Sequence, residues 1–463
     1  MKSLHEKKLL KLVVIDEAHM IPMTNVSFRP DFANLKHNLF QYASGVPIVA
    51  MTATMTKDLL RVFSERTGIE QFDYVTWGDI SRRDVDITIC TKSVPTHFMK
   101  SCVQKHLKRQ LSKVIVYSNE KHYAKYNAVN SVENVLKTHN LEGEVLSVHG
   151  DTSLGFKQWV GSNFCDQLGK DDTNFNVRVL AATESADCGI DASNCTLCVC
   201  VGAPPSLASL SQRLGRVGRD AKRKEGDEFI LIQSIPTFNF LIRRHHMNKN
   251  VAERNYQIKQ TMEVMKFVSI QDECMHVKLE RYFSNPDDEG NLEDPCKTRC
   301  SFCKNKPLVP PLTRRNLIFV LDALFSKKDT TTENAIDAIF KAREHIWIHY
   351  CNEVTKDVVH ALLIQLLALE IVEYQVHVKD DDRDKMSNIV LKIGWSRLKE
   401  ESGLIAVPTY ACLNRWKGIN LNESSYLTLN ERHSTVHMQI DSDVVSGDEM
   451  KGRKQARGTK RNR

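Results

Sequence analysis

Two adjacent carboxylates are the first residues of this chain whose placement suggests chemistry. Asp16 and Glu17 follow an apolar run, Leu12 to Ile15, in the sequence LVVIDEAH, which ends at His19. A buried strand that ends in this way delivers polar side chains to the carboxyl edge of a parallel sheet, where nucleotides bind. Asp16 is suited to hold Mg²⁺, and Glu17 to orient and deprotonate the water that attacks the γ-phosphate of ATP. We assign His19 to the same cofactor pocket. The alternative is a strand that merely ends in an acidic turn.

Polar residues after later strand-like runs extend this interpretation. Thr52 and Thr54 end the next apolar run, and their hydroxyls are placed to bridge the nucleotide pocket and a nucleic-acid face. Thr183 follows a strand further along and is expected on the nucleic-acid path. Gly189 and Asp191 come shortly after it and are expected at the edge of the cofactor pocket.

The strongest single signal is QRLGRVGRD, which begins at Gln212. Arg216 and Arg219 are three residues apart, a spacing that places two side chains on one face of a helical turn. The neighbouring glycines allow close backbone approach, so both guanidinium groups can bind a phosphate presented by an opposing lobe. Arginines of this kind stabilise transition-state charge when the lobes close, and Gln212 is expected at the same phosphates. A solvated basic turn is the alternative.

Four cysteines have the spacing of a metal site. Cys274, Cys296, Cys300 and Cys303 give the pattern C-x₂₁-C-x₃-C-x₂-C. Four thiolates at such spacings can close a tetrahedral Zn²⁺ site, and its loss should unfold the segment. Unrelated buried cysteines are the alternative. His276 is a less favoured ligand, because two residues separated by one position on a helix point in different directions.

A second group of cysteines is predicted to be core. Three of its members, Cys195, Cys198 and Cys200, lie on or beside the apolar run TLCVCV, and Cys188 precedes them. Cysteine in such a run behaves as a small apolar residue, and no turn gathers these thiols around an ion.

The periodicity of the apolar residues predicts the elements that must position these side chains. Helices are expected between the strands and again through the second half of the chain. The predicted strands are Leu12 to Ile15, Pro47 to Met51, Lys113 to Tyr117, Val145 to Val148, Val177 to Ala181, Thr196 to Val201, Ile371 to Lys379 and Asn388 to Ile393. The last two follow three helices, at about 316–326, 332–343 and 355–369, which suggests a winged helix that contacts duplex DNA. Lys356 begins the third of these helices and is placed to meet a phosphate.

Composition sets broad limits. Of the 463 residues, 41% are hydrophobic, and 64 basic residues against 57 acidic ones give a net charge of +7. No apolar run approaches the roughly 20 residues that a membrane helix requires. Thirteen irregularly spaced cysteines favour a reducing, intracellular compartment. The end of the chain, KGRKQARGTKRNR, holds seven basic residues and no acidic one, as is typical of tails that contact phosphate backbones or direct nuclear import, and also of purely solubilising tails.

Together, IDEAH, TAT, AATESADCGID and QRLGRVGRD resemble motifs II, III, V and VI of superfamily 2 helicases. The phrase that begins at Phe28 and Arg29 (FRPDF), the VIVYSN strand and the glutamine that opens the last motif make the chain similar to the RecQ family. This resemblance implies an ATP-dependent 3′-to-5′ DNA helicase of repair, recombination or replication. It also implies single-stranded DNA and duplex junctions as partners, with Phe28 and Arg29 at the nucleic acid.

The resemblance implies an α/β fold of two tandem RecA-like lobes, the first incomplete, followed by a helical zinc-binding module and a winged-helix domain. The predicted boundaries are 1–88 for the partial first lobe, 89–245 for the second lobe, 246–310 for the zinc module, 311–416 for the winged helix and 417–463 for a disordered basic tail.

Three departures from the family pattern qualify this interpretation. No G-x-x-x-x-G-K-[S/T] loop occurs in the 463 residues, so we expect an amino-terminally truncated form with negligible ATPase activity. The stretch MIPMTNVSFRP has no tryptophan with which to sense single-stranded DNA. The predicted hairpin tip, DDDRDKM, is acidic and has no aromatic residue to separate strands. A non-catalytic DNA-binding platform remains an alternative. A second is an RNA helicase of the same superfamily, against which the four-cysteine module and the FRPD phrase argue.

Overall fold

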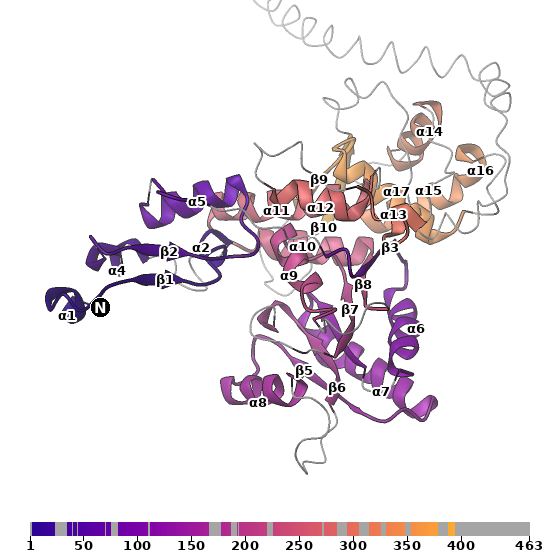
Figure 1. Ribbon diagram of the computed structural model, residues 1–463. Helices are drawn as coiled ribbons and strands as arrows, with labels where there is room; N and C mark the ends of the chain where they lie inside the picture. Colours follow the sequence, from indigo (N-terminus) through magenta and orange to yellow (C-terminus); the bar gives the residue numbers. More distant parts are fainter. Residues whose placement is uncertain are drawn as a thin grey trace, which may run out of the picture.

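The middle of the chain forms a six-stranded sheet in which all neighbouring strands are parallel (Figure 1). Every residue of the two central strands β4 and β7 is buried, as a parallel sheet with both faces covered requires. The spatial order is β3 (Asp86–Thr91), β8 (Glu228–Gln233), β7 (Cys195–Val201), β4 (Lys113–Ser118), β6 (Val177–Ala182) and β5 (Glu144–Val148).

The structure is a computed structural model and describes most of the chain up to residue 393. Within this part, no helix has the length and apolar character needed to span a membrane. The described residues are 2–23, 35–38, 40–43, 45–69, 71–75, 82–109, 112–165, 177–186, 192, 194–219, 226–270, 273–284, 294–304, 314–325, 330–347, 352, 354–377 and 388–393.

Helices cover both faces of this sheet. One face packs against α6 (Pro95–Leu107), a π-helical turn (Tyr123–Ala128) and α7 (Val129–Thr138), which continues from that turn. The opposite face packs against α8 (Leu154–Cys165), α9 (Leu207–Leu214) and α10 (Ile235–His246). Successive residues of β4 alternate between the two apolar clusters, as the period of a strand dictates. The predicted α/β architecture of this lobe is therefore confirmed.

The cysteines of β7 are core residues, as predicted. Cys195, Cys198 and Cys200 are fully buried in the apolar cluster on the α9 side of the sheet. Burial raises the pKa of the Cys198 thiol well above its ordinary value, so it stays protonated. Cys188 lies outside the described residues.

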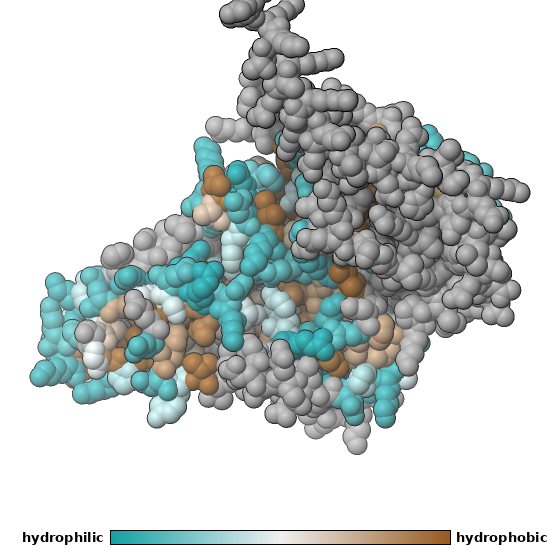
Figure 2. Space-filling view, turned by 90° about the horizontal axis from the view of Figure 1, so that it is seen from above, coloured by the Kyte–Doolittle hydropathy of each residue, from teal (hydrophilic) through white to brown (hydrophobic). Residues whose placement is uncertain are grey.

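The amino-terminal region is a much smaller α/β unit. Its two strands, β1 (Val13–Ile15) and β2 (Ile48–Ala50), pair in parallel. Its buried cluster consists of Ala18, Ile21 and Phe63. Apolar side chains reach the surface on this arm of the molecule, at the left of Figures 1 and 2. Its helical segments are α1 (Lys2–Glu6), α2 (Met20–Met23), α4 (Leu35–Asn38), a 3₁₀ turn (Phe40–Tyr42) and α5 (Lys57–Thr67).

Helices dominate the chain after the sheet. A long helix, α11 (Val251–Ser269), leads to α12 (Met275–Phe283) and to the short α13 (Ser301–Lys304). The elements expected for a winged helix follow in the expected order. They are α14 (Arg314–Phe325), α15 (Thr332–Lys341), α16 (Arg343–Ile346), α17 (Lys356–Ala368) and the antiparallel strands β9 (Val372–His377) and β10 (Asn388–Ile393).

The third helix of this array, α17, has no exposed face beyond its first turn. All residues from Val358 to Ala368 are buried, and the helix packs against α11, α15 and the sheet. A recognition helix must present one side to a DNA groove. In this arrangement α17 is a central core helix, so contacts with duplex DNA could come only from its amino-terminal end.

The cysteine-rich segment covers the outer edge of the six-stranded sheet. The Ile87 amide donates to the Arg299 carbonyl at 2.8 Å, and Ile87 forms a parallel bridge with Cys300. Lys304 adds an ion pair with Asp86 at 2.7 Å. Because β3 spans residues 86–91, the predicted lobe boundary after residue 88 falls inside a strand and has to move upstream. That edge strand had not been anticipated.

Candidate nucleotide site and cysteine cluster

His19 joins three of the sequence motifs. Its Nδ1 lies 2.8 Å from the Thr52 hydroxyl oxygen, and its Nε2 lies 2.7 Å from Nε2 of Gln212. Nδ1 is also 3.3 Å from the Glu17 carboxylate. The strand-ending DEAH segment, the TAT segment and the QRLGRVGRD helix α9 therefore meet at one imidazole. Sequence reasoning assigned His19 to the cofactor and did not anticipate this linking position.

The hydrogen bonds define the protonation state of His19. The amide nitrogen of Gln212 can only donate, so Nε2 of His19 accepts and the ring proton resides on Nδ1. Nδ1 then donates to Thr52, which also accepts from the Thr54 amide at 3.2 Å. Burial lowers the pKa of His19 to about 4, with partial opposition from the Asp16 charge. The imidazole is therefore neutral at pH 7, as its bond to Gln212 requires.

The acidic pair lies in a tight turn at the end of β1. Glu17 has φ = 49°, in the left-handed region that residues with a side chain seldom occupy. The Asp16 carboxylate accepts the Glu17 amide at 2.9 Å, and the Ala18 amide donates to the Met51 carbonyl. These bonds fix the turn, and backbone conformations of this kind are frequent at functional sites. The turn holds the Asp16 and Glu17 carboxylates at the carboxyl edge of the small sheet.

The two arginines of QRLGRVGRD differ in environment. Helix α9 ends at Leu214, before either of them, and Gly218 between them has φ = 67°. Arg216 is buried, whereas Arg219 is exposed and donates to the Gly215 carbonyl at 2.8 Å. They therefore do not share the face of a helical turn, which corrects the geometric argument from their spacing.

Arg82 braces this arginine loop. Its Nη2 donates to the Val217 carbonyl at 2.5 Å and to the Gly218 carbonyl at 3.1 Å. Two further hydrogen bonds join its guanidinium to the Asp84 carboxylate. A Cβ atom on Gly218 would lie 2.9 Å from the Arg82 Nη2 atom. Nothing in the sequence singled out Arg82, because its partners are backbone carbonyls about 135 residues away.

The remaining predicted site residues are only partly placed. Thr54 is buried, and Thr183 follows β6 with its hydroxyl 3.1 Å from Ser185. Lys356 is exposed and forms an ion pair with Asp337 at 3.1 Å. The predicted positions Phe28, Arg29, Gly189 and Asp191 lie outside the described residues, as do the acidic hairpin tip and the basic tail.

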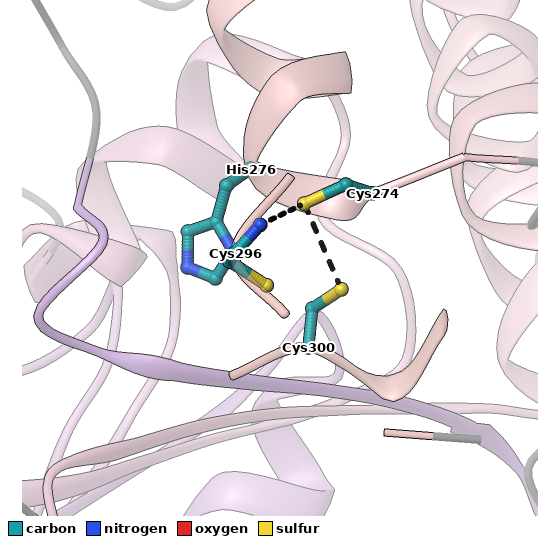
Figure 3. A group of neighbouring side chains, drawn as sticks. All are labelled: Cys274, His276, Cys296 and Cys300. Carbon is teal, nitrogen blue, oxygen red and sulfur yellow. Dashed lines mark hydrogen bonds between the residues drawn. The ribbon is translucent and has the colours of Figure 1, made fainter. Parts of the chain in front are cut away.

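Three of the four predicted metal ligands gather beside the edge strand β3 (Figure 3). The possible ligand atoms of Cys274, His276, Cys296 and Cys300 all lie within 4.8 Å of one another. Cys300 donates to Cys274, whose Sγ also accepts the Cys296 amide at 3.3 Å. These bonds lower the pKa of the Cys274 thiol, with the Cys300 contact the largest cause. A soft donor set of this kind suits Zn²⁺.

Cys303 does not belong to this compact group, although its thiol lies beside Cys296 and Cys300. His276 does, contrary to the expectation from helical spacing. Cys274 caps α12 with φ = −57° and ψ = 126°, which is not a helical conformation. The argument from helix periodicity therefore does not apply across residues 274–276, and both side chains reach the same point.

Comparison with known proteins is consistent with this geometry. Residues 98–221 match the family model of the helicase conserved C-terminal domain. A putative ATP-dependent RNA helicase of Acanthamoeba polyphaga mimivirus is 24% identical over 304 residues, which cover 64% of this chain and 48% of that protein. A putative ATP-dependent DNA helicase Q1 of Caenorhabditis elegans is 23% identical, with 64% and 42% covered. The ATP-dependent DNA helicase RecQ of Pasteurella multocida is 25% identical, with 64% and 42% covered.

The matched domain is one that helicases carry, and the chain is similar to helicases of superfamily 2. Among these helicases the chain is RecQ-like, as its similarity to several RecQ-family proteins shows. The chain spans less than half the length of the relatives described above.

Proposed function

We propose that this chain carries the second motor lobe and part of the first lobe of an ATP-dependent DNA helicase of the RecQ type, which moves 3′ to 5′ and acts in repair, recombination or replication. One observation carries the proposal: the bond between His19 and Gln212 joins the DEAH segment to the QRLGRVGRD segment across 193 residues of sequence. RecQ-family relatives named as DNA helicases support DNA over RNA, although one relative is named an RNA helicase.

Each of the proposed site residues has a separate role in ATP hydrolysis. Mg²⁺ bound near Asp16 would neutralise phosphate charge, and Glu17 would orient and deprotonate the attacking water. Arg216 and Arg219, which belong to the second lobe, would bind the phosphates of the nucleotide. The neutral His19 is hydrogen-bonded to Gln212 on one side and to Thr52 on the other. A movement of α9 would therefore displace the TAT segment through these two hydrogen bonds. This provides a physical route from the nucleotide to the predicted nucleic-acid face.

The cysteine cluster is proposed to hold a structural Zn²⁺ in the same protein. The sulfur atoms of Cys274 and Cys300 are buried beside backbone amides and would bind such an ion as thiolates, and the segment they hold has few apolar residues of its own. The ion would fasten this segment to the sheet edge and would take no part in hydrolysis. Lys356 is the proposed phosphate contact of the carboxy-terminal helices, provided that it releases Asp337.

The experiment compares the 463-residue chain with a chain extended by the sequence encoded upstream of Met1. The extended protein should hydrolyse ATP when single-stranded DNA is added and should unwind 3′-tailed DNA duplexes in preference to RNA duplexes. Glu17→Gln should abolish turnover in the extended protein, and Gln212→Ala should lower the turnover number while leaving DNA binding intact. The 463-residue chain should bind DNA without turnover, because it has no phosphate-binding loop.

A non-catalytic DNA-binding platform, in which the second lobe, the cysteine-rich segment and the carboxy-terminal helices serve as a docking surface, is the second candidate. An upstream sequence without a phosphate-binding loop, or an extended protein that binds DNA and shows no turnover, would replace the helicase proposal with this one. Preferential unwinding of RNA duplexes would overturn the choice of DNA.

A further inference from the structure

We propose that the turn between α10 and α11 is a binding surface for the phosphate backbone of duplex DNA, with Arg244, Lys249 and Arg254 as its contacts. This surface rests on the proposed function, because it says where the duplex part of a tailed DNA substrate meets the protein. The turn lies outside the sequence motifs and beyond the matched domain, which ends at residue 221.

The turn carries an excess of positive charge. Residues 243–254, RRHHMNKNVAER, include four arginine and lysine residues and one carboxylate, that of Glu253. Glu253 is buried, and its charge partly offsets the fall that burial causes in the pKa of Arg66 in α5. Arg244 and Lys249, in contrast, are exposed. The surface of the turn is therefore positive, as the binding of a polyanion requires.

Two helices contribute to this surface. Helices α10 and α11 pack against each other, and the basic turn joins them (Figure 1). Burial lowers the pKa of His246 at the end of α10, and the charge of Arg254 in the first turn of α11 lowers it further. Arg254 therefore lies close to the end of α10, so that charges from both helices form one patch.

Two of the proposed contacts are available to a ligand. Within the described part of the chain, neither Lys249 nor Arg254 lies in an ion pair with a carboxylate. The turn is fixed by other bonds, among them that from the Glu253 amide to the side chain of Asn250 at 3.1 Å. Lys356 differs from them, because it already pairs with an aspartate. A phosphate can therefore bind at the turn without breaking an existing ion pair of Lys249 or Arg254.

Arg244 places the patch next to the predicted path of the nucleic acid. It forms an ion pair with Glu184 at 3.7 Å, and about half of each side chain is exposed. Glu184 directly follows Thr183, which the sequence assigns to the nucleic-acid path. An exposed ion pair is weak, so Arg244 can exchange the carboxylate for a phosphate. DNA that passes Thr183 would therefore reach the turn between α10 and α11.

The aromatic ring beside this turn favours duplex over single-stranded DNA. Sites for single strands combine basic residues with aromatic rings on which the bases stack. Among the described contacts of the turn, the ring is that of Tyr374 in β9. It packs edge-on against Phe238 and His246, with centroids 5.9 Å and 6.5 Å away, and is therefore not available to a base. A surface of charges alone suits a duplex, whose backbone carries one charge per about 1.7 Å of helix axis.

The position of the turn also fits a duplex. Helix α17 is a core helix and presents no side to a DNA groove. Tyr374 joins β9 of the same carboxy-terminal region to the end of α10. A duplex held near these elements would meet the turn between α10 and α11, where contacts with its backbone position it without reading its bases.

The test measures binding of the full chain to a blunt duplex and to a single strand of the same length, by fluorescence anisotropy at several salt concentrations. The double variant Lys249→Ala, Arg254→Ala should lower duplex affinity on the order of tenfold per contact near 0.1 M salt. It should also reduce the slope of log K against log salt by about 0.9 per contact. The loss should be the same for duplexes of unrelated sequence, and affinity for the single strand should stay nearly unchanged.

The matched control is the double variant Lys108→Ala, Lys137→Ala. It removes the same charge from exposed residues at the ends of α6 and α7, which lie on the opposite face of the sheet from α10. This variant should leave duplex affinity and salt slope nearly unchanged. Lys249→Glu, at an exposed position of the turn, should weaken duplex binding further while the melting temperature stays the same.

A wild-type chain without measurable duplex affinity would overturn the proposal, as would an unchanged affinity and salt slope in the Lys249→Ala, Arg254→Ala variant. An equal loss in the control variant, or an equal loss for the single strand, would do the same. If the double variant does not fold, Lys249→Glu still decides. ATP turnover of the extended protein is a separate measurement: its absence would remove the helicase proposal and leave the duplex-binding surface standing.

Discussion

The two parallel sheets of this chain are made from similar strands, but only one of them is covered. In β4 and β7 every side chain is buried, and helices pack on both faces of the six-stranded sheet. In the two-stranded sheet, Val14, Val49 and Met51, which directly follows β2, are 51%, 42% and 47% exposed. A sheet of two strands has little stability of its own. The region with the acidic pair therefore depends on contacts with the rest of the molecule.

Among the described residues, those contacts are both apolar and polar: Leu59 of α5 is buried in the large apolar cluster, and two polar links join the regions. His19 bonds to Gln212, and Asp58 at the start of α5 pairs with Lys259 of α11 at 2.9 Å. Exposed pairs such as the second are worth less than about 1 kcal/mol. The comparison teaches that the proposed catalytic carboxylates belong to the less stable region, whereas the arginine loop belongs to the more stable one.

The largest expected effect comes from two matched phenylalanines. Phe229 of β8 and Phe63 of α5 are both fully buried, the first in the large apolar cluster and the second in the small one. Phe229→Ala should lower the free energy of global unfolding by about 3–5 kcal/mol, through lost burial and the cavity it leaves. Phe63→Ala should leave the main thermal transition almost unchanged and accelerate hydrogen exchange only in residues 13–69. Equal shifts of the main transition by the two variants would show that the two regions unfold together.

Acid should destabilise the large region, by a smaller amount than Phe229→Ala does. Burial lowers the pKa of His245 and of His360 to about 4, while the unfolded chain titrates near pH 6.5. The unfolded state therefore binds more protons between pH 6.5 and pH 4, and the free energy of unfolding falls as the pH falls through that window. Each histidine should cost on the order of 1–3 kcal/mol by pH 4. In His245→Gln and in His360→Gln, the melting temperature should depend less steeply on pH across this range.

Protonation of His19 over the same pH range should change the structure only locally. A protonated imidazole cannot accept the Gln212 amide, so the link between the regions should be lost near the His19 pKa of about 4. Hydrogen exchange of the DEAH turn should rise before the main transition does. An exchange rate of this turn that is insensitive to pH, after correction for intrinsic chemistry, would contradict the role given to His19.

The smallest of these effects concerns the glycine of the arginine loop. Gly218→Ala places a side chain at φ = 67° and a Cβ atom 2.9 Å from Arg82, which should cost on the order of 1–2 kcal/mol. Gly161→Ala is the control, since this helical glycine has no atom within 4 Å of its added Cβ and should gain about 0.5–1 kcal/mol. Denaturant titration would measure both. A neutral Gly218→Ala would mean that Arg82 does not hold the loop tightly.

The sequence was most informative where apolar runs are continuous. The four strands predicted in the second lobe match β4, β5, β6 and β7 to within one residue at each end, because strands buried on both faces show such runs. The helix order of the carboxy-terminal part was equally clear from its 3.6-residue period. The edge strand β3, DITICT, was missed because it follows a charged stretch that resembles a boundary between domains.

Long-range partners were beyond reach for a different reason. The roles of Gln212 and Arg82 are defined by contacts with residues 193 and about 135 positions away, and no local pattern encodes such distances. The placement of His276 depended on the backbone angles of one residue, Cys274, where an extended segment turns into a helix. Residue types were enough to locate the cysteine cluster, but which side chains point into it depends on the backbone conformation.

The position of the cysteine-rich segment on β3 also bears on how the protein behaves in concentrated solution. An uncovered strand at the rim of a sheet is a template on which a second molecule can add its own strand. Here Arg299 and Cys300 pair with β3 and cover its free edge. The proposed ion would keep them in this position. Chelation should therefore promote self-association, visible as a shift to faster sedimentation that zinc reverses.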